Sequence, residues 1–120
     1  MSVFFKSFTY AFKGIILSIK ERNMKIHVGC AILSILFGFL FNITITEWFV
    51  ILICIGAVLA LEMINTAIEH LVDLVEPNYN PKAGAIKDIA AGAVLVFSII
   101  SALIGIMIFG KYILALLFEN

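Results

Sequence analysis

The chain has 120 residues, of which 63% are hydrophobic and 13% charged, and its mean hydropathy is +1.17. A soluble domain of this size could not bury so much apolar surface, so the composition predicts a membrane protein. The net charge is zero and no segment combines a dense basic patch with aromatic residues, which excludes a nucleic-acid partner.

The N-terminal segment, residues 1–25, is predicted to form a helix that lies on the membrane surface. Phe4, Phe8 and Phe12 recur at helical spacing, while lysines recur every seven residues on another face. This pattern is typical of an interfacial helix with its rings in the acyl chains and its lysines toward the headgroups. The alternative is a helix that packs with its aromatic face on protein.

Three further segments, 28–45, 48–75 and 84–118, are predicted to be membrane helices. Each contains an apolar stretch long enough to cross about 30 Å of hydrocarbon, and the last two continue beyond it as cytoplasmic extensions. No linker or internal repeat separates them, so residues 1–120 are predicted to form one domain. The expected fold is an all-α membrane protein with an N-terminal amphipathic surface helix and three transmembrane helices.

The basic residues predict how the chain is oriented in the cell membrane. Only Lys111 lies on the side opposite the N-terminus. The positive-inside rule therefore places the N-terminus and the 76–88 loop in the cytoplasm and the C-terminus outside. The basic residues on the cytoplasmic side are Lys6, Lys13, Lys20, Arg22, Lys25, Lys82 and Lys87.

The second membrane helix carries a polar stripe at its cytoplasmic end. At about 100° per residue, Asn65, Glu69 and Asp73 lie within roughly 60° of Glu62 on a helical wheel. Carboxyl groups are expensive inside a bilayer and are rarely kept there without a function. We therefore treat this stripe as the candidate functional site.

Depth separates the members of the stripe. Glu62 lies fourteen residues after the interfacial Trp48, or about 21 Å along a helix, which is still at the inner margin of the hydrocarbon. Glu69 is about 10 Å farther, at the headgroups, and Asp73 is expected in water. The prolines and asparagines of 76–81 end the helix, and the next helix is expected to begin near 83–84.

Three interpretations of this stripe remain open from the residues alone. A carboxylate in apolar surroundings can accept a proton from an alcohol, carboxylates nearer water suit Mg²⁺, and Lys87 nearby can neutralise a transferred phosphoryl group. That combination describes phosphoryl transfer from a nucleotide to a membrane alcohol. Alternatively, the carboxyls pair with basic residues and fix the helix packing, or they line a proton or cation path.

No standard nucleotide-binding motif decides between these three interpretations of the stripe. The chain has no Gly-x-x-x-x-Gly-Lys-Ser/Thr loop and no Gly-x-Gly-x-x-Gly, so a nucleotide site would have to be built from helices and their ends. His27 is expected at the start of the first membrane helix and His70 on the wet flank of the stripe. The two histidines are too isolated for a metal pair, and we assign neither a function.

Two motifs resemble a known family. The run 62–69 (Glu-Met-Ile-Asn-Thr-Ala-Ile-Glu), then Asp73, and the run 86–94 (Ile-Lys-Asp-Ile-Ala-Ala-Gly-Ala-Val) look like the signature of prokaryotic diacylglycerol kinases. This variant of the motifs resembles the undecaprenol kinase branch of Gram-positive bacteria. The resemblance extends over essentially the whole chain and includes 12–14 and 21–23.

The resemblance implies a homotrimer of three-span subunits that phosphorylates a lipid alcohol with MgATP at sites shared between subunits. The implied acceptor is undecaprenol, with diacylglycerol as the alternative in the same family. Two other classes remain as competing hypotheses, namely a small ion or proton transporter and a purely structural oligomer.

The resemblance implies site residues for this chain, which we assign by their positions in the matching motifs. Glu62 matches the proton acceptor, with Glu69 as second choice, and Asn65 matches its polar neighbour. Glu69 also matches a ligand of metal and nucleotide, and Lys87 matches the phosphate contact. The remaining positions assigned to the nucleotide site are Tyr10, Asp73, Asn78, Tyr79, Asn80 and Asp88.

The resemblance also calls for a second metal carboxylate just before the first membrane helix. Glu21 is the only candidate there, although counting from 12–14 places Arg22 at that position. We choose Glu21 because it offers carboxylate oxygens and an arginine cannot ligate Mg²⁺. Like Glu69, it is also counted among the residues that bind the MgATP unit.

Substrate choice is expected to lie outside the catalytic residues. Undecaprenol and diacylglycerol both present a primary hydroxyl at the same depth, so the groups that act on it cannot distinguish the two lipids. Selection is expected in a groove between the surface helix and the neighbouring spans, where Phe4, Phe5, Phe8 and Phe12 gather.

Overall fold

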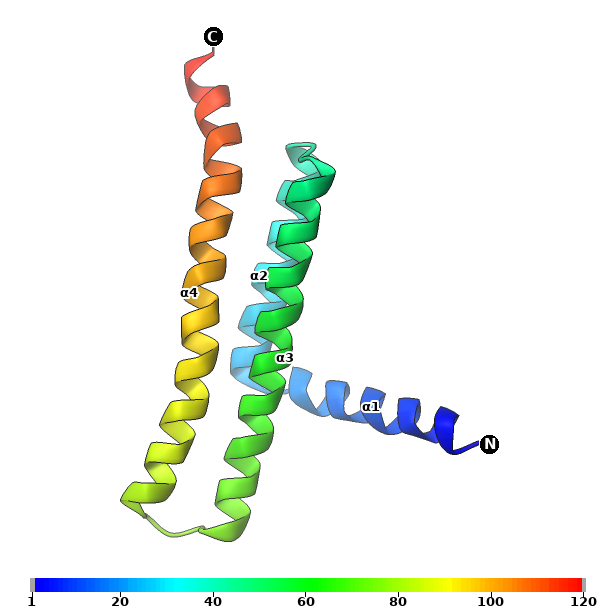
Figure 1. Ribbon diagram of the computed structural model, residues 1–120, viewed down its shortest axis with the longest axis vertical. Coiled ribbons are helices and arrows are strands. Elements are labelled where there is room, and N and C mark those ends of the chain that lie inside the picture. Colours follow the sequence, from blue (N-terminus) through cyan, green and yellow to red (C-terminus); the bar gives the residue numbers. More distant parts are fainter. Residues whose placement is uncertain (1, 120) are drawn as a thin grey trace.

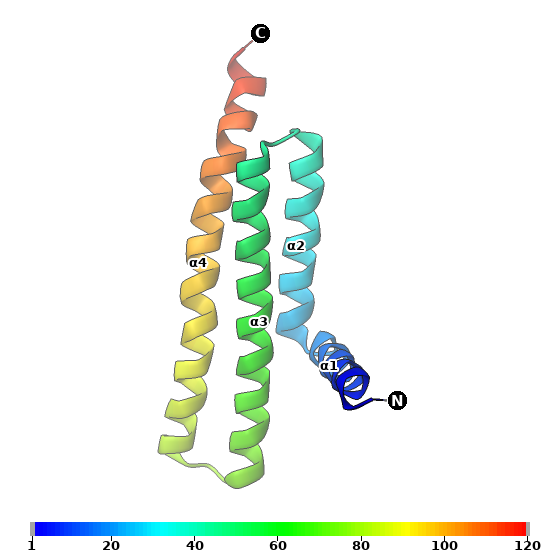
Figure 2. The same cartoon turned by 45° about the vertical axis from the view of Figure 1, so that its right-hand side comes forward.

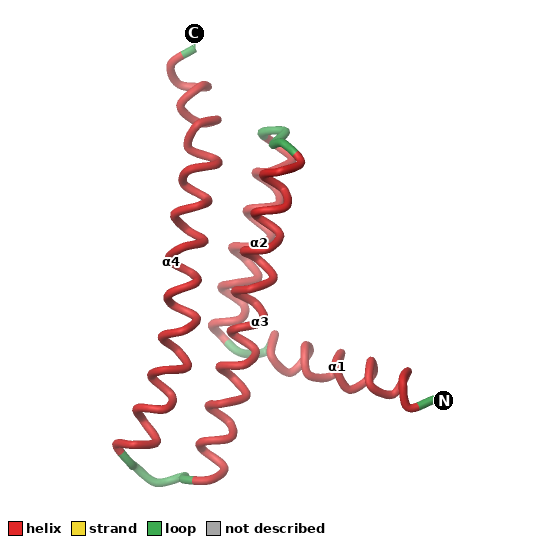
Figure 3. Tube along the Cα trace, in the orientation of Figure 1, coloured by secondary structure: helices red, strands yellow, loops and turns green. Residues whose placement is uncertain are grey.

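The computed structural model describes residues 2–119, and the regular structure within them is entirely helical (Figures 1 and 3). The prediction of an all-α chain with three membrane-spanning helices is confirmed, because α2, α3 and α4 are each long and apolar enough to cross a membrane. The elements in chain order are α1 (Val3–Ile19), α2 (Arg22–Leu40), α3 (Ile45–Val75) and α4 (Pro81–Phe118).

The three long helices stand side by side, and α3 lies between α2 and α4 (Figure 2). The shorter α1 leaves this bundle at a steep angle near the start of α2, where it packs against α2 and α3. The α3–α4 turn lies beyond the level of α1, so both helices extend past it (Figure 1). The rings of Phe4, Phe5, Phe8 and Phe12 on α1 are all exposed.

The first two helices differ from their predicted ranges. Residues 1–25 do not form one helix, because α1 ends at Ile19 and the extended backbone of Glu21 starts α2. At the other end, α2 stops at Leu40 rather than at 45. Asn42 then turns the chain with a φ of 50°, a left-handed conformation that asparagine tolerates better than most residues.

The last helix begins earlier than the expected 83–84. Asn80 caps it, since its Oδ1 accepts hydrogen bonds from the backbone N–H of Lys82 at 2.9 Å and of Ala83 at 3.4 Å. Pro81 occupies the first turn, where its missing N–H costs nothing. The asparagine and proline that end one helix therefore also start the next.

The end of the bundle next to the α2–α3 turn is closely packed. Ile43, Ile51 and Phe109 form a buried cluster from the turn, α3 and α4, and the Phe37 ring of α2 meets the Phe109 ring edge-on at 5.8 Å. Gly38 of α2 lies directly under the Trp48 ring of α3. This end therefore joins all three long helices.

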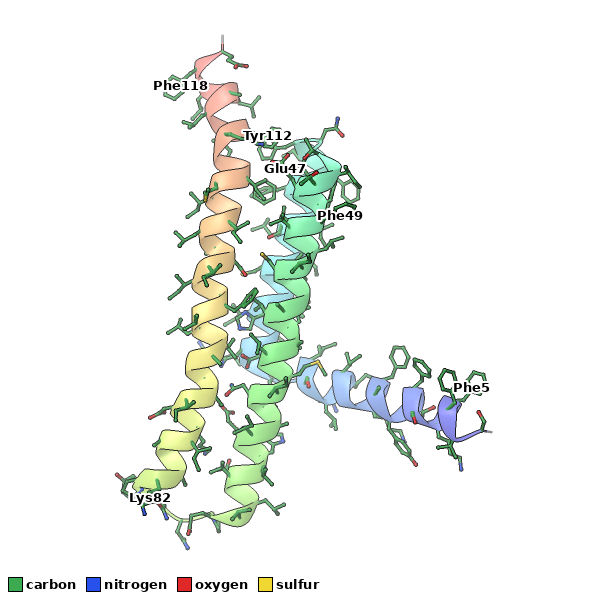
Figure 4. The ribbon with its side chains drawn as sticks, viewed as in Figure 1. Phe5, Glu47, Phe49, Lys82, Tyr112 and Phe118 are labelled. Carbon is green, nitrogen blue, oxygen red and sulfur yellow. The ribbon has the colours of Figure 1, made fainter. Side chains whose placement is uncertain are left out.

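Glu47 adds a polar clamp at the same end (Figure 4). Its carboxylate completes a capping box with Thr44, accepts a 2.6 Å hydrogen bond from the Tyr112 hydroxyl, and lies 2.7 Å from the Lys111 ammonium. Tyr112 and Lys111 belong to α4, so one carboxylate both starts α3 and fixes the neighbouring helix to it. Hydrogen bonds to a charged group contribute about 1.5–3 kcal/mol each.

The contact between α2 and α3 predicts a glycine requirement at position 38. A Cβ there would lie 2.5 Å from the Trp48 ring, so Gly38→Ala should cost about 1–3 kcal/mol through overpacking and lower the melting temperature of the detergent-solubilised protein. Gly29→Ala in the same helix is the matched control, because nothing lies within 4 Å of its added methyl group. Equal melting temperatures for the two variants would contradict the close packing described here.

Candidate active site

The centre of the polar stripe is a buried carboxylate that is contacted from two helices. Glu62 of α3 is 3% exposed, and its Oε2 lies 3.5 Å from Nε2 of His27 on α2. No local sequence pattern pairs these residues, because they lie far apart in the chain. Their contact follows from the antiparallel packing of α2 against α3, which brings the start of α2 beside the middle of α3.

Asn65 lies on the same face of α3 and is also buried, at 3% exposure. Its Nδ2 donates a hydrogen bond of 3.3 Å to Oε1 of Glu69. Its Oδ1 is buried with no hydrogen-bond partner in the described part of the chain. A buried, unpaired acceptor is costly, so this oxygen requires a donor such as a hydroxyl group or a water molecule.

A small polar cavity of about 200 Å³ opens beside these residues. Glu62 and Asn65 form its α3 wall and His27 lies on its α2 wall. The α4 wall contributes small or apolar side chains and one hydroxyl, that of Ser98. The full lining is Asn23, His27, Glu62, Asn65, Ala91, Val94, Leu95 and Ser98.

A larger cavity of about 650 Å³ adjoins the polar one and is lined mainly by apolar residues of α2, α3 and α4. His27 and Ser98 line both cavities, so they mark the junction between them. The hydroxyl oxygens of Ser98 and Ser101 are buried without partners in the described residues. The cavity thus lies between α2, α3 and α4, and the groove beside the α1 phenylalanines stays a prediction for lipid selection.

Glu21 reaches the stripe from the α1–α2 junction. Its Oε1 lies 3.6 Å from Nε2 of His70, the residue that follows Glu69 on α3. Although Glu21 is the N-cap residue of α2, its side chain makes no capping hydrogen bond. The chain therefore brings the Glu21 carboxylate against α3 at His70, the residue next to Glu69 in sequence.

The carboxylates form an open arrangement rather than a closed metal cage. Within residues 2–119 no group of three His, Cys, Asp or Glu side chains comes together as a metal site. Such a sparse set of ligands fits Mg²⁺, which retains several waters and binds through one or two carboxylates and phosphate oxygens. It does not fit a tetrahedral Zn²⁺ site, which needs at least three protein ligands.

Lys87, at the start of α4, faces the stripe across the α3–α4 turn. Its Nζ lies 2.5 Å from Oδ1 of Asp73, and this hydrogen-bonded carboxylate raises the pKa of the Lys87 ammonium. Lys87 therefore stays charged at any physiological pH. The next residue, Asp88, is exposed.

The other predicted nucleotide contacts do not converge on Glu62 within one chain. Asn78 and Tyr79 lie in the α3–α4 turn, where Tyr79 is 94% exposed, and the Asn80 side chain caps α4. Tyr10 lies midway along α1, and the Lys13 ammonium contacts its ring. Of the predicted residues, the structure brings Glu62, Asn65 and Glu69 together, and separately pairs Asp73 with Lys87.

These features define a helical membrane protein in which a buried carboxylate lines a polar pocket that adjoins an apolar cavity. The family model of prokaryotic diacylglycerol kinase matches residues 9–109. The chain therefore belongs to the prokaryotic diacylglycerol kinase family, and it is a lipid kinase. The resemblance drawn from the sequence motifs is confirmed.

Two curated relatives agree with this assignment. The chain is 48% identical to undecaprenol kinase of Bacillus subtilis over 107 residues, which covers 88% of this chain and 87% of that protein. It is 35% identical to diacylglycerol kinase of Synechocystis over 101 residues, which covers 82% of this chain and 58% of that longer protein.

Proposed function

We propose that this protein transfers the γ-phosphoryl group of ATP to undecaprenol and produces undecaprenyl phosphate. The observation that carries the proposal is the buried Glu62 carboxylate in a polar pocket that adjoins an apolar cavity through His27 and Ser98. A long lipid alcohol needs this combination, because its chain must stay in apolar surroundings while its hydroxyl reaches a base. The 48% identity to an undecaprenol kinase supports that lipid as acceptor.

In the proposed reaction Glu62 is the general base. Its carboxylate accepts the proton of the lipid hydroxyl, and the lipid oxygen forms a bond to the γ-phosphorus. The bond from that phosphorus to the bridging oxygen breaks, and ADP leaves with the electron pair. Asn65 lies beside Glu62 in the same pocket and helps to shape the place of the incoming hydroxyl, whose single hydrogen goes to Glu62.

Glu21 and Glu69 are the proposed ligands of Mg²⁺. When bound, Mg²⁺ would neutralise charge on the phosphate oxygens. The hydrogen bond from Asn65 orients the Glu69 carboxylate. The Glu21 side chain makes no capping hydrogen bond, which supports its assignment as the second ligand. His70, which adjoins Glu69 in sequence, lies against Glu21 and supports Glu21 over Arg22 as the second ligand.

Lys87 is proposed to contact the transferred phosphoryl group, with Asp73 holding its ammonium in place. Asp88, Tyr10 and the turn residues Asn78, Tyr79 and Asn80 are proposed to contact the nucleotide. Because Tyr10 lies on α1, away from the bundle, its participation fits a site completed by a neighbouring subunit. We therefore retain the homotrimer with shared sites as part of the proposal.

The proposed setting is the cell membrane, with the N-terminus and the active site facing the cytoplasm and the C-terminus outside. The basic residues on α1 and around the α3–α4 turn support this orientation. The exposed rings of α1 and its steep angle to the bundle suit a helix lying in the interface.

The proposal predicts that Glu62→Gln abolishes catalysis while preserving the fold. Removing a general base costs about 10²–10⁴-fold in rate, so kcat should fall by about that factor with the KM for ATP little changed. The measurement is ATP-dependent phosphorylation of undecaprenol by purified protein in lipid micelles. Glu119→Gln, an exposed carboxyl at the far end of α4, is the control and should retain full activity. If the Glu62→Gln protein phosphorylated undecaprenol at the parental rate, Glu62 would not be the general base.

Magnesium dependence tests the choice between Glu21 and its neighbour. Glu21→Gln removes one of two carboxylate ligands, so the Mg²⁺ concentration for half-maximal activity should rise at least about tenfold. Arg22→Gln should leave that concentration within about twofold of the parental value, because guanidinium groups do not ligate cations. An unchanged Mg²⁺ requirement in Glu21→Gln would exclude it as a ligand.

The acceptor is tested by comparing kcat/KM for undecaprenol and for diacylglycerol side by side, with the same preparation and saturating MgATP. We expect the higher value for undecaprenol, since both lipids meet the same base and differ only in the part that enters the apolar cavity. A much higher kcat/KM for diacylglycerol would reassign the acceptor and leave the lipid kinase activity intact.

A further inference from the structure

His27 is the one side chain that contacts the Glu62 carboxylate from another helix. The imidazole is 20% exposed and the carboxylate 4%, so the two groups meet in a largely water-free place. His70 also lies near a carboxylate, but its side chain is 67% exposed and it lines neither cavity. The environment of His27 is therefore distinct within this chain.

The contact with Glu62 restricts where the hydrogen of the His27 imidazole can lie. Nε2 lies 3.5 Å from a carboxylate oxygen, and two unprotonated acceptors at that separation with little water between them would repel each other. With Glu62 ionised, as a general base must be, Nε2 carries the hydrogen that is directed at it. His27 holds the carboxylate at Oε2, and Oε1 is the oxygen that His27 leaves free for the alcohol.

The position of His27 at the junction of the two cavities matters equally. An alcohol that moves from the apolar cavity into the polar pocket meets His27 on α2 and Ser98 on α4, the residues that line both cavities and form what we call the His27–Ser98 passage. The Ser98 hydroxyl is buried without a partner and can hydrogen-bond to a passing or resting hydroxyl group. The passage thus brings the alcohol to the carboxylate that His27 orients.

We infer that His27 is a positioning residue for phosphoryl transfer, which fixes the Glu62 carboxylate so that its free oxygen faces the alcohol at the His27–Ser98 passage. This inference rests on the proposed function, since it assigns Glu62 the part of base. It adds a role for α2, which the sequence motifs on α3 and α4 do not contain. His27 itself neither takes the proton from the substrate nor contacts the nucleotide.

The test compares His27→Leu with His27→Gln in purified protein. Leucine fills a similar volume without a donor, whereas the Nε2 of glutamine can take the place of the imidazole Nε2. We expect His27→Leu to lower kcat about 10- to 100-fold with the KM for ATP unchanged, and His27→Gln to recover most of that loss. A residue that only packs α2 on α3 would show the reverse, because leucine would preserve activity and the melting temperature.

A double-mutant cycle ties the effect to Glu62. In the Glu62→Gln background, His27→Leu should cause no further loss, since the group it positions has gone. Full kcat in His27→Leu, or equal losses in both backgrounds, would overturn the inference while the parental enzyme remains a lipid kinase. By contrast, a parental protein that phosphorylates no lipid alcohol would overturn the proposed function itself.

Discussion

Keeping a carboxylate inside a bundle of apolar helices is the constraint on which this structure depends. Removing an ionised carboxyl from water costs several kcal/mol unless nearby groups compensate. His27 and Asn65 are the neutral polar groups beside Glu62, and among residues 2–119 no salt bridge joins Glu62 to a lysine or arginine. A lysine or arginine beside the carboxylate would stabilise its charged form and make it a weaker base. Neutral polar partners such as His27 and Asn65 therefore suit proton transfer better.

This arrangement divides the bundle into a fixed end and an open end. The Gly38–Trp48 contact and the Glu47 clamp join the three long helices near the α2–α3 turn. The larger cavity extends from Phe37, Ile51 and Phe109 of this end to His27 and Ser98, and Glu62 lines the smaller polar pocket that adjoins it there. Because the fixed end sets the spacing of α2 and α3, it also sets the distance between His27 and Glu62, although no member of the clamp is near the site.

Periodicity and residue type were sufficient to predict the helices and the stripe. Glu62, Asn65 and Glu69 share one helix, so a 3.6-residue repeat places them correctly without any tertiary information. His27 was missed because its significance comes from contact across two helices, which no local pattern encodes. The break at Glu21 was also missed, because the polar run 20–23 contains no proline or glycine to mark the end of a helix. The apolar cavity could not be predicted, because an enclosed volume depends on how α2, α3 and α4 pack.

Under the proposed function, the apolar cavity would let enzymes of this family act on different lipids with one set of catalytic groups, because Glu62 would meet only the hydroxyl that these acceptors share. The rest of the acceptor would meet an apolar lining in which Ser98 and Ser101 provide buried hydroxyls without partners among the described residues. A serine hydroxyl on a helix can hydrogen-bond to the backbone carbonyl four residues earlier. These hydroxyls therefore need not stay unpaired when a hydrocarbon chain lies beside them. A diacylglycerol would instead bring ester carbonyls that these hydroxyls can bind. Preference between the two lipids therefore depends on the few polar atoms beyond the His27–Ser98 passage, while the chemistry at Glu62 stays the same.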